Sequence, residues 1–405
     1  AVFRAGLGGS GIEWPAVRTG AEYRHNLTST LLLGRKESSC GLFLFLPGLG
    51  KSHVFGVWNI YHKGTTYGGR VMKKLTAIVT CFVIVVMSSA VGAAEIVLNY
   101  ANFPPAPTFP CVQMERWKAE VEERTGGKVQ INTFPGGTLL GAKAMFRGVE
   151  QGQADIGCSS MAYLPGVFPM TSAVGLPVGF TSAETASRVL WDLYTRYKPE
   201  EFSRVKVLTM FTSAPSNLMS KKRVTVLEDF QGLELRASGS LSRSLELLGA
   251  TPVSMPMSET PEALQKGVVQ GLLSSLEVLK DFNYAAYCPY QTILNLQVYP
   301  FAVVMNRDVW EGLPPEVQKV MHDLGPQQAE WTGKYMDEHV EEALKYAQDK
   351  YSTQVDRLSA ADMDKLQAKV SPIVDEWKQE AGEAGLTAED IYQELLALKE
   401  KYEQK

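Results

Sequence analysis

The side chains that most often carry out catalysis are scarce in most of this 405-residue chain. From residue 95 onward there are two histidines, His322 and His339, and three cysteines, Cys111, Cys158 and Cys288. Both histidines fall in amphipathic helical stretches dense in Glu and Lys, which predicts solvated surface positions. Neither histidine is near a candidate nucleophile, and hydrolysis needs a nucleophile and a base within hydrogen-bond reach. We therefore expect no enzymatic activity.

The cysteine spacing indicates neither a metal site nor a disulfide framework. Three cysteines are an odd number, and no two of them have the C-x-x-C spacing of a zinc site. A single bridge between Cys111 and Cys158 is compatible with an oxidising compartment and stays open as an alternative to free thiols. We expect no metal and no other cofactor.

A complete secretion signal is found inside the chain. Met72-Lys73-Lys74 is a cationic start, residues 75–91 are apolar, and Gly92-Ala93-Ala94 offers the small side chains that a signal peptidase needs. The alternative is an internal transmembrane helix, but a bilayer requires about 20 apolar residues and this run is barely long enough. We interpret residues 1–71 as a mis-assigned leader and residues 72–94 as a cleaved signal peptide that directs the protein to the periplasm.

The chain that remains after cleavage is acidic. Residues 1–94 hold ten of the 40 Lys and Arg residues but three of the 44 Asp and Glu residues, which leaves a net charge of −11 on the rest. An acidic chain is a poor binder of nucleic acid or of an anionic membrane, and we expect neither as a partner. The remaining 311 residues are enough for two domains with their own cores.

Strands and helices alternate along this part of the chain. The predicted strands cover residues 96–101, 128–134, 155–157, 208–211, 233–237 and 251–254. The predicted helices cover residues 109–125, 142–151, 240–248 and 259–266, and residues from about 313 onward are nearly all helical. Such alternation predicts α/β domains with mixed or parallel sheets, in which ligands bind at the carboxyl ends of the strands.

We therefore expect a two-lobed α/β fold. Lobe I is predicted over residues 95–205, lobe II over residues 206–305, and a helical C-terminal part over residues 306–405 that packs on both lobes. Two lobes on a secreted chain without catalytic side chains suggest a solute-binding protein.

Six short segments make this suggestion specific. They are Gly137–Gly141, Glu150–Gly157, Glu228–Arg236, Leu248–Glu259, Ala263–Gly271 and Leu313–Gln318. The third contains Asp229-Phe230-Gln231-Gly232-Leu233-Glu234-Leu235-Arg236, which is similar to a D-x-x-G-L-K-x-R pattern. Taken in order, the six segments resemble the substrate-binding proteins of TRAP (tripartite ATP-independent periplasmic) transporters, the DctP-like family.

The resemblance implies a periplasmic binding protein that closes on an organic acid and delivers it to the membrane subunits of a TRAP permease. In that family the arginine at the end of the third segment grips the ligand carboxylate, and here it is Arg236. The chemistry fits, because an unpaired guanidinium in a buried strand is costly and a planar guanidinium meets a carboxylate with two hydrogen bonds. The alternative is an internal ion pair between Arg236 and an acid such as Glu259.

Departures from the family pattern limit the chemical class of ligand that we expect. Leu272-Leu273-Ser274-Ser275 stands where other members carry polar residues that bind ligand oxygens or sodium, and Ala214-Pro215-Ser216-Asn217 stands where some carry a second arginine. Aromatic residues near predicted strand ends are Phe103, Phe109, Tyr163, Phe180 and Phe211, for which core packing is the alternative. We therefore expect a monocarboxylate with an apolar or aromatic body.

The candidate ligand-binding residues are Arg236, Phe103, Ser159, Ser160, Tyr163, Ser216, Asn217, Ser238, Leu273 and Ser274. The competing functional class is an ABC-type periplasmic solute-binding protein, which would share the architecture but not the six segments.

Overall fold

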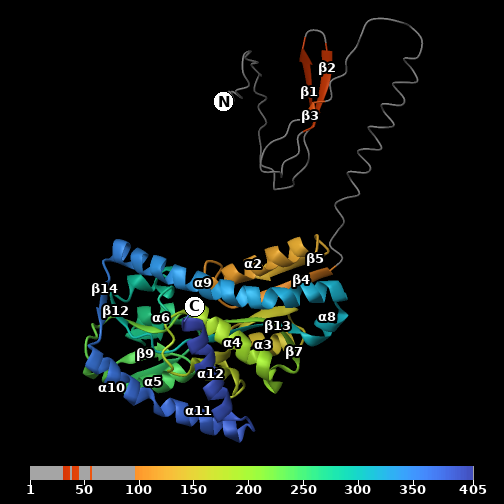
Figure 1. Ribbon diagram of the computed structural model, residues 1–405. Coiled ribbons are helices and arrows are strands. Elements are labelled where there is room, and N and C mark those ends of the chain that lie inside the picture. Colours follow the sequence, from red (N-terminus) through yellow and green to blue (C-terminus); the bar gives the residue numbers. More distant parts are fainter. Residues whose placement is uncertain (1–30, 37–38, 45–54, 57–95, 405) are drawn as a thin grey trace, which may run out of the picture. The chain divides into compact units, whose positions relative to one another are not determined.

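The computed structural model of the protein describes residues 31–36, 39–44, 55–56 and 96–404 (Figure 1). The chain divides into two compact units, Ala1–Ser89 and Ala90–Lys405. In the first unit, three strands form a small antiparallel sheet: β1 (Leu31–Lys36), β2 (Ser39–Leu44) and β3 (Phe55–Gly56). The predicted signal peptide over residues 72–94 lies outside the described residues.

The second unit contains two mixed sheets. The first sheet has the strand order β5-β4-β6-β13-β7, in which β4 is parallel to β5 and β6 while β13 is antiparallel to β6 and β7. Its strands are β4 (Ile96–Asn102), β5 (Val129–Phe134), β6 (Ile156–Ser160), β7 (Val205–Thr212) and β13 (Pro300–Asn306). Its helices are α2 (Phe109–Arg124), α3 (Met145–Glu150) and α4 (Ala183–Tyr197).

The second sheet has the strand order β10-β9-β11-β8-β12-β14. Its strands are β8 (Asn217–Ser220), β9 (Glu234–Ala237), β10 (Thr251–Ser254), β11 (Gly271–Ser274), β12 (Tyr290–Ile293) and β14 (Gln354–Arg357). Helices α5 (Ser240–Leu248), α6 (Thr260–Lys266) and α7 (Val278–Asp281) connect them. The two-lobed α/β fold with mixed sheets that the sequence predicts is therefore confirmed.

The sheets do not follow the lobe boundary expected at residue 205. Strands β7 and β13, which the sequence analysis places in lobe II, pair with each other and with β6 in the first sheet. The reason is that the chain crosses between the sheets after β7 and crosses back before β13. Since every residue of β13 is buried, its backbone groups need partners on both sides, and β6 and β7 supply them.

The two crossing segments lie side by side and are bonded to each other. The backbone N–H of Ser213 donates to the carbonyl of Tyr299 at 2.9 Å, and that of Ser216 donates to Gln297 at 2.7 Å. The Asn217 side-chain oxygen accepts from the N–H groups of Leu294 and Asn295. These bonds form a two-stranded connection between the lobes.

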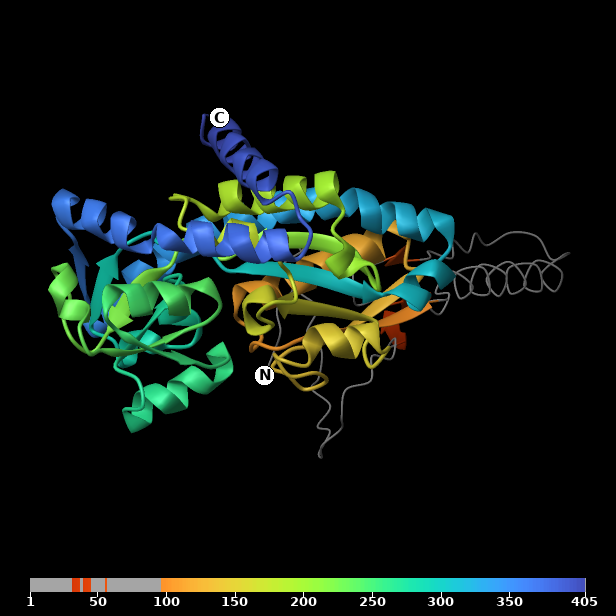
Figure 2. The same cartoon turned by 90° about the horizontal axis from the view of Figure 1, so that it is seen from below.

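The C-terminal part is mostly helical, as expected, with strand β14 as an exception. Its helices are α8 (Arg307–Gly312), α9 (Pro315–Tyr351), α10 (Ala360–Val370), α11 (Pro372–Glu383) and α12 (Ala388–Glu403). The long helix α9 packs on α2, α4 and β7 of the first lobe and on α7 of the second (Figure 2). None of the helices in the described residues has the length and apolar character needed to cross a bilayer.

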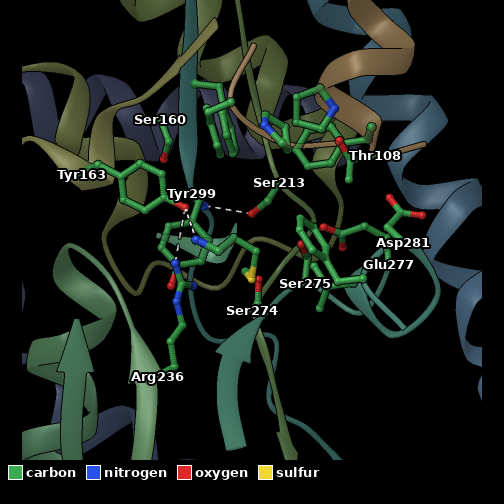
Figure 3. Close-up of a pocket in the computed structure, with 18 residues that line it drawn as sticks. Thr108, Ser160, Tyr163, Ser213, Arg236, Ser274, Ser275, Glu277, Asp281 and Tyr299 are labelled. Atoms are coloured by element: carbon green, nitrogen blue, oxygen red, sulfur yellow. Dashed lines mark hydrogen bonds between the residues drawn. The ribbon is translucent and has the colours of Figure 1, made fainter. Parts of the chain in front are cut away.

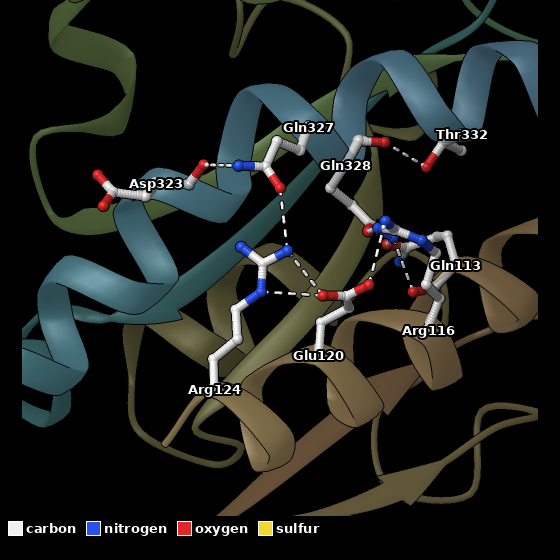
Figure 4. Close-up of polar contacts among 8 residues, drawn as sticks. All are labelled: Gln113, Arg116, Glu120, Arg124, Asp323, Gln327, Gln328 and Thr332. Atoms are coloured by element: carbon white, nitrogen blue, oxygen red, sulfur yellow. Dashed lines mark hydrogen bonds and ion pairs between the residues drawn. The ribbon is translucent and has the colours of Figure 1, made fainter. Parts of the chain in front are cut away.

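A polar network fixes α9 on α2 (Figure 4). The Gln328 amide donates to the carbonyl oxygen of Gln113 at 2.9 Å, and its oxygen accepts from Arg116. Gln113 in turn donates to the hydroxyl of Tyr100 on β4 at 2.7 Å. Because Gln113 and Gln328 are fully buried, each of these bonds also avoids the cost of an unpaired polar group.

Two expectations about reactive side chains are settled by this packing. Cys111 and Cys158 are buried free thiols, so the possible disulfide is not formed. The prediction for His322, which is exposed, is confirmed, but the prediction for His339 is wrong because that side chain is 7% exposed. Although the sequence of α9 is rich in Glu and Lys, one face of this helix packs on α7. On that face, His339 Nε2 lies 2.7 Å from an Asp281 oxygen.

Candidate functional site

A cavity of about 480 Å³, counting its mouth, lies between the two lobes. Its lining comes from the loop after β4, the start of α2, the ends of β6 and β11, strand β9, helix α7 and both crossing segments. The strands thus deliver side chains at their carboxyl ends, as expected for open α/β sheets.

Arg236 on β9 is the cation of this cavity (Figure 3). It is 1% exposed, and its Nε and Nη2 atoms donate to the carbonyl of Met255 at 3.0 and 2.8 Å. Nη2 also donates to the Tyr163 hydroxyl at 3.4 Å. Nη1 has no partner among the described residues. The guanidinium is therefore held by Met255 and Tyr163, the Tyr299 hydroxyl also interacts with it, and Nη1 is left without a hydrogen bond of good geometry.

The charge of Arg236 is not neutralised by an acid in this structure. No ion pair of the described residues includes Arg236, so the alternative pairing with Glu259 is not formed. Burial acts to lower the pKa of Arg236, but the surrounding phenol groups, chiefly that of Tyr163, leave it raised above its usual value. The group stays cationic and would bind an anion with little competition from water.

The walls beside the guanidinium are aromatic. Phe103 packs edge-on against Tyr163 with ring centroids 5.5 Å apart, and Phe109 packs edge-on against Phe301 at 5.4 Å. Tyr299 completes this side and donates to the carbonyl of Leu273 at 3.2 Å. These rings shape an apolar compartment next to a single cation.

Two acids lie across the cavity from Arg236. Figure 3 shows Glu277 and Asp281 on the side opposite the arginine, next to Ser275. Burial raises the pKa of Glu277 to about 7, although the Ser275 hydroxyl acts to lower it. In the part of the chain that the structure describes, no three His, Cys, Asp or Glu side chains are grouped to hold a metal ion.

Half of the ten predicted binding residues line the cavity. These are Arg236, Phe103, Ser160, Tyr163 and Ser274. Of the other aromatic residues that were noted near predicted strand ends, Phe109 lines the cavity. Phe180 and Phe211 are buried but do not line it.

The other five predicted residues do not line the cavity. Ser216 and Asn217 belong to the crossing connection, where backbone bonds occupy them. Ser159 is buried within β6, and the Leu273 side chain is buried within β11. Ser238 supports the site from behind, because its N–H donates to the Tyr299 hydroxyl at 3.3 Å.

Sequence reasoning missed several lining residues. They are Thr108, Ser213, Ser275, Glu277, Asp281 and Tyr299. The signal for the two acids was weak, because Glu277 at the N-cap of α7 and Asp281 at its last position cannot be told by sequence from solvated acids. Tyr299 and Ser213 could not be found without knowing that the crossing segments pair.

We expect the His339–Asp281 pair to make stability depend on pH. The hydrogen bond to Asp281 is the main cause that raises the pKa of His339, while burial acts to lower it. Such a pair adds stability that is complete below about pH 6.5 and is lost as the pH rises through the folded-state pKa. Wild type should therefore lose its advantage in unfolding free energy over His339→Gln as the pH rises from about 6 to about 8.5 in urea titrations. A difference that stays constant over this range would contradict the assignment.

The comparisons with known proteins agree with this geometry. The sequence profile of the bacterial extracellular solute-binding protein family 7 (DctP) matches residues 104–380. The chain belongs to this family. It is thus a DctP-like solute-binding protein of the TRAP type, a transport component and not an enzyme, and the ABC-type alternative is set aside.

Solved structures of the DctP family share the fold over most of the second unit. A TRAP periplasmic solute-binding protein from Desulfovibrio salexigens is 61% identical, with a TM-score of 0.71 over 77% of this chain and 98% of that one. A marine metagenome TRAP protein specific for aromatic acids, solved with metahydroxyphenylacetate, is 28% identical, with a TM-score of 0.73 over 76% of this chain and 99% of its own.

Sequence relatives extend the range of ligands within the DctP family. The C4-dicarboxylate-binding protein DctB of Bacillus subtilis is 21% identical over 75% of this chain and 87% of its own length. Members of the family therefore bind acids of different kinds, and the choice among them has to be argued from the cavity.

Proposed function

We propose that this protein captures a monocarboxylate with an apolar or aromatic body in the cavity between its lobes and delivers it to the membrane subunits of a TRAP permease. The observation that carries the proposal is the Nη1 group of Arg236, which is buried in the cavity and has no partner among the described residues. A carboxylate is the partner that a guanidinium meets with the best geometry.

The lining favours one carboxylate and an unsaturated ring. Arg236 is the single Lys or Arg among the described residues that line the cavity, so a second carboxylate would lie unpaired beside Glu277 and Asp281. The aromatic rings offer faces and edges to an apolar ligand body. The 28% identical TRAP protein that was solved with metahydroxyphenylacetate supports the same class.

A thermal-shift screen tests the proposed function. A ligand at a hundredfold excess over its Kd stabilises the folded protein by about 2.7 kcal/mol. We expect monocarboxylates with apolar or aromatic bodies to raise the melting temperature by several degrees, while neutral sugars and polyols should have no effect. A response to sugars and to no acid would overturn the proposal.

We further propose that the protein is exported to the periplasm, with Met72 as its initiator. The complete signal pattern of residues 72–94 supports this, as does a fold shared with extracytoplasmic binding proteins. N-terminal sequencing of the native protein should then give a first residue at Ala94 or Glu95. Peptides from residues 1–70 in the native protein would show that the leader is retained.

A further inference from the structure

The cavity has a second polar end that the proposed function does not use. Glu277 is 3% exposed, and its Oε2 atom has no hydrogen-bond partner among the described residues. Asp281 Oδ2 likewise has no partner, and the Ser275 hydroxyl, which lies close enough to Glu277 to lower the pKa of that acid, makes no hydrogen bond of good geometry. Figure 3 shows these three side chains together, on the other side of the cavity from Arg236.

Unpartnered polar atoms are concentrated at this cavity. Ten buried side-chain nitrogen or oxygen atoms of the described residues have no partner, and four of them belong to residues that line it. A buried polar group that stays unpaired costs free energy, and native proteins leave few such groups. Their gathering around one cavity indicates that a ligand supplies the missing partners.

Two basic side chains of α7 and α9, Lys280 and His339, are bonded to acids other than Glu277. The Lys280 ammonium lies 3.1 Å from Glu342, and His339 Nε2 lies 2.7 Å from the other oxygen of Asp281. Asp281 is therefore held by His339, whereas no cation is paired with Glu277 in the described residues. Without a paired cation the ionised form of this acid is disfavoured, which agrees with its pKa being raised to about 7, and its oxygens stay available to a ligand donor.

We propose that the ligand is an aromatic carboxylic acid with a hydrogen-bond donor, a hydroxyl or an amino group, on the ring end away from its carboxylate, and that Glu277 accepts from this donor. This inference rests on the proposed function, because it takes Arg236 as the site of the carboxylate. Ser275 and Asp281 offer additional acceptors beside Glu277. The aromatic walls formed by Phe103, Phe109 and Phe301 would hold the ring between the two polar ends.

A hydrogen-bond donor on the ligand ring would provide the partner that the buried Glu277 oxygen lacks, which an unsubstituted aromatic acid cannot do. A ligand with an unsubstituted ring would bury Glu277 against carbon and leave its oxygen unpaired. Sites built to bond a ligand hydroxyl or amine discriminate strongly against the analogue that lacks it, because the buried groups of the site then stay unpaired. Glu277 would thus be a specificity-determining residue.

Isothermal titration with matched ligands tests this inference. The probes are phenylacetate, its 3- and 4-hydroxy derivatives, its 3- and 4-amino derivatives, and the 3- and 4-fluoro derivatives, which match the hydroxyl in size but cannot donate. We expect the best hydroxy or amino acid to bind wild type at least about tenfold more tightly than phenylacetate and its fluoro isostere, in line with about 1.4 kcal/mol per decade. Comparison of the affinities of the hydroxy and amino derivatives shows which of the two donors the site binds.

Variants of Glu277 show whether this residue provides the preference. Glu277→Leu should reduce the preference to within about threefold while phenylacetate binds as before or better, and Glu277→Gln, which keeps one acceptor oxygen, should retain part of it. Thermal unfolding confirms that both variants are folded, and Glu311→Leu on the exposed face of α8 is the control that should change nothing.

The outcomes separate this inference from the proposed function. Equal binding of phenylacetate and its derivatives by wild type, or a preference that survives in Glu277→Leu, would overturn the inference alone. If wild type binds an aliphatic monocarboxylate but none of the aromatic acids, this inference falls and the proposed function stands. If it binds no monocarboxylate of either kind, both fall.

Discussion

Arg236→Ala is expected to weaken binding of the acid ligand by about 30-fold to several thousandfold. Removal of one partner of a buried charge pair costs about 2–5 kcal/mol, and each 1.4 kcal/mol is about tenfold in affinity. The arginine is 1% exposed and lines the cavity, so the ligand carboxylate would lose its counter-ion where water cannot replace it. Isothermal titration with an acid found by the thermal-shift screen measures the change.

Two further substitutions sharpen this test. Arg236→Lys should recover only part of the affinity, because an ammonium can neither bond Met255 as the guanidinium does nor present two parallel donors. Arg243→Ala is the control, since Arg243 is exposed on α5 and pairs with Glu246 and Glu376. If the affinity of Arg236→Ala for the acid is within about threefold of wild type, a loss of binding free energy below roughly 0.7 kcal/mol, then Arg236 is a structural residue and does not bind the ligand.

Trp117→Ala is expected to lower the free energy of unfolding by about 3–5 kcal/mol, as large aromatic deletions in well-packed cores do. Trp117 is fully buried on α2, the helix whose first turn brings Phe109 to the cavity. Its indole nitrogen has no hydrogen-bond partner among the described residues. Trp117→Phe should cost much less, because it keeps most of the packing and removes an unpaired N–H group.

Trp331→Ala is the matched control for this stability experiment. Trp331 on α9 is only partly buried, where it stacks on Tyr335 and lies under the Arg116 guanidinium. Its removal should cost less than half as much in urea unfolding. Equal losses for Trp117→Ala and Trp331→Ala would show that α2 is not anchored through Trp117.

The sequence was most informative where local patterns decide the structure. Helix α5 and strand β10 have the predicted bounds, because amphipathic spacing and the glycine turn at Gly249 specify them locally. Arg236 could be found because it stands in a recognisable segment, and because a guanidinium in a strand predicted to be buried needs a partner. Its position in the cavity agrees with that interpretation, while its role in binding stays a proposal.

Features that depend on contacts between distant segments were not predictable in the same way. The return of β13 to the first sheet is set by pairing with β6 and β7, and nothing within residues 300–306 marks that choice. Ser216 and Asn217 were expected in the site, but their bonding partners near residues 294–297 make them part of the connection. Glu277 and His339 look like surface residues until the packing of α7 against α9 is known.

The central claim is that Arg236 holds the carboxylate of an aromatic or apolar acid. A crystal structure of the protein with a ligand that passes the thermal-shift screen tests it most directly. The account predicts a carboxylate oxygen about 2.7–2.9 Å from Arg236 Nη1, with the guanidinium still bonded to Met255. A bound ligand without an acid group, or a carboxylate that is bound elsewhere while Nη1 stays unpaired, would contradict it.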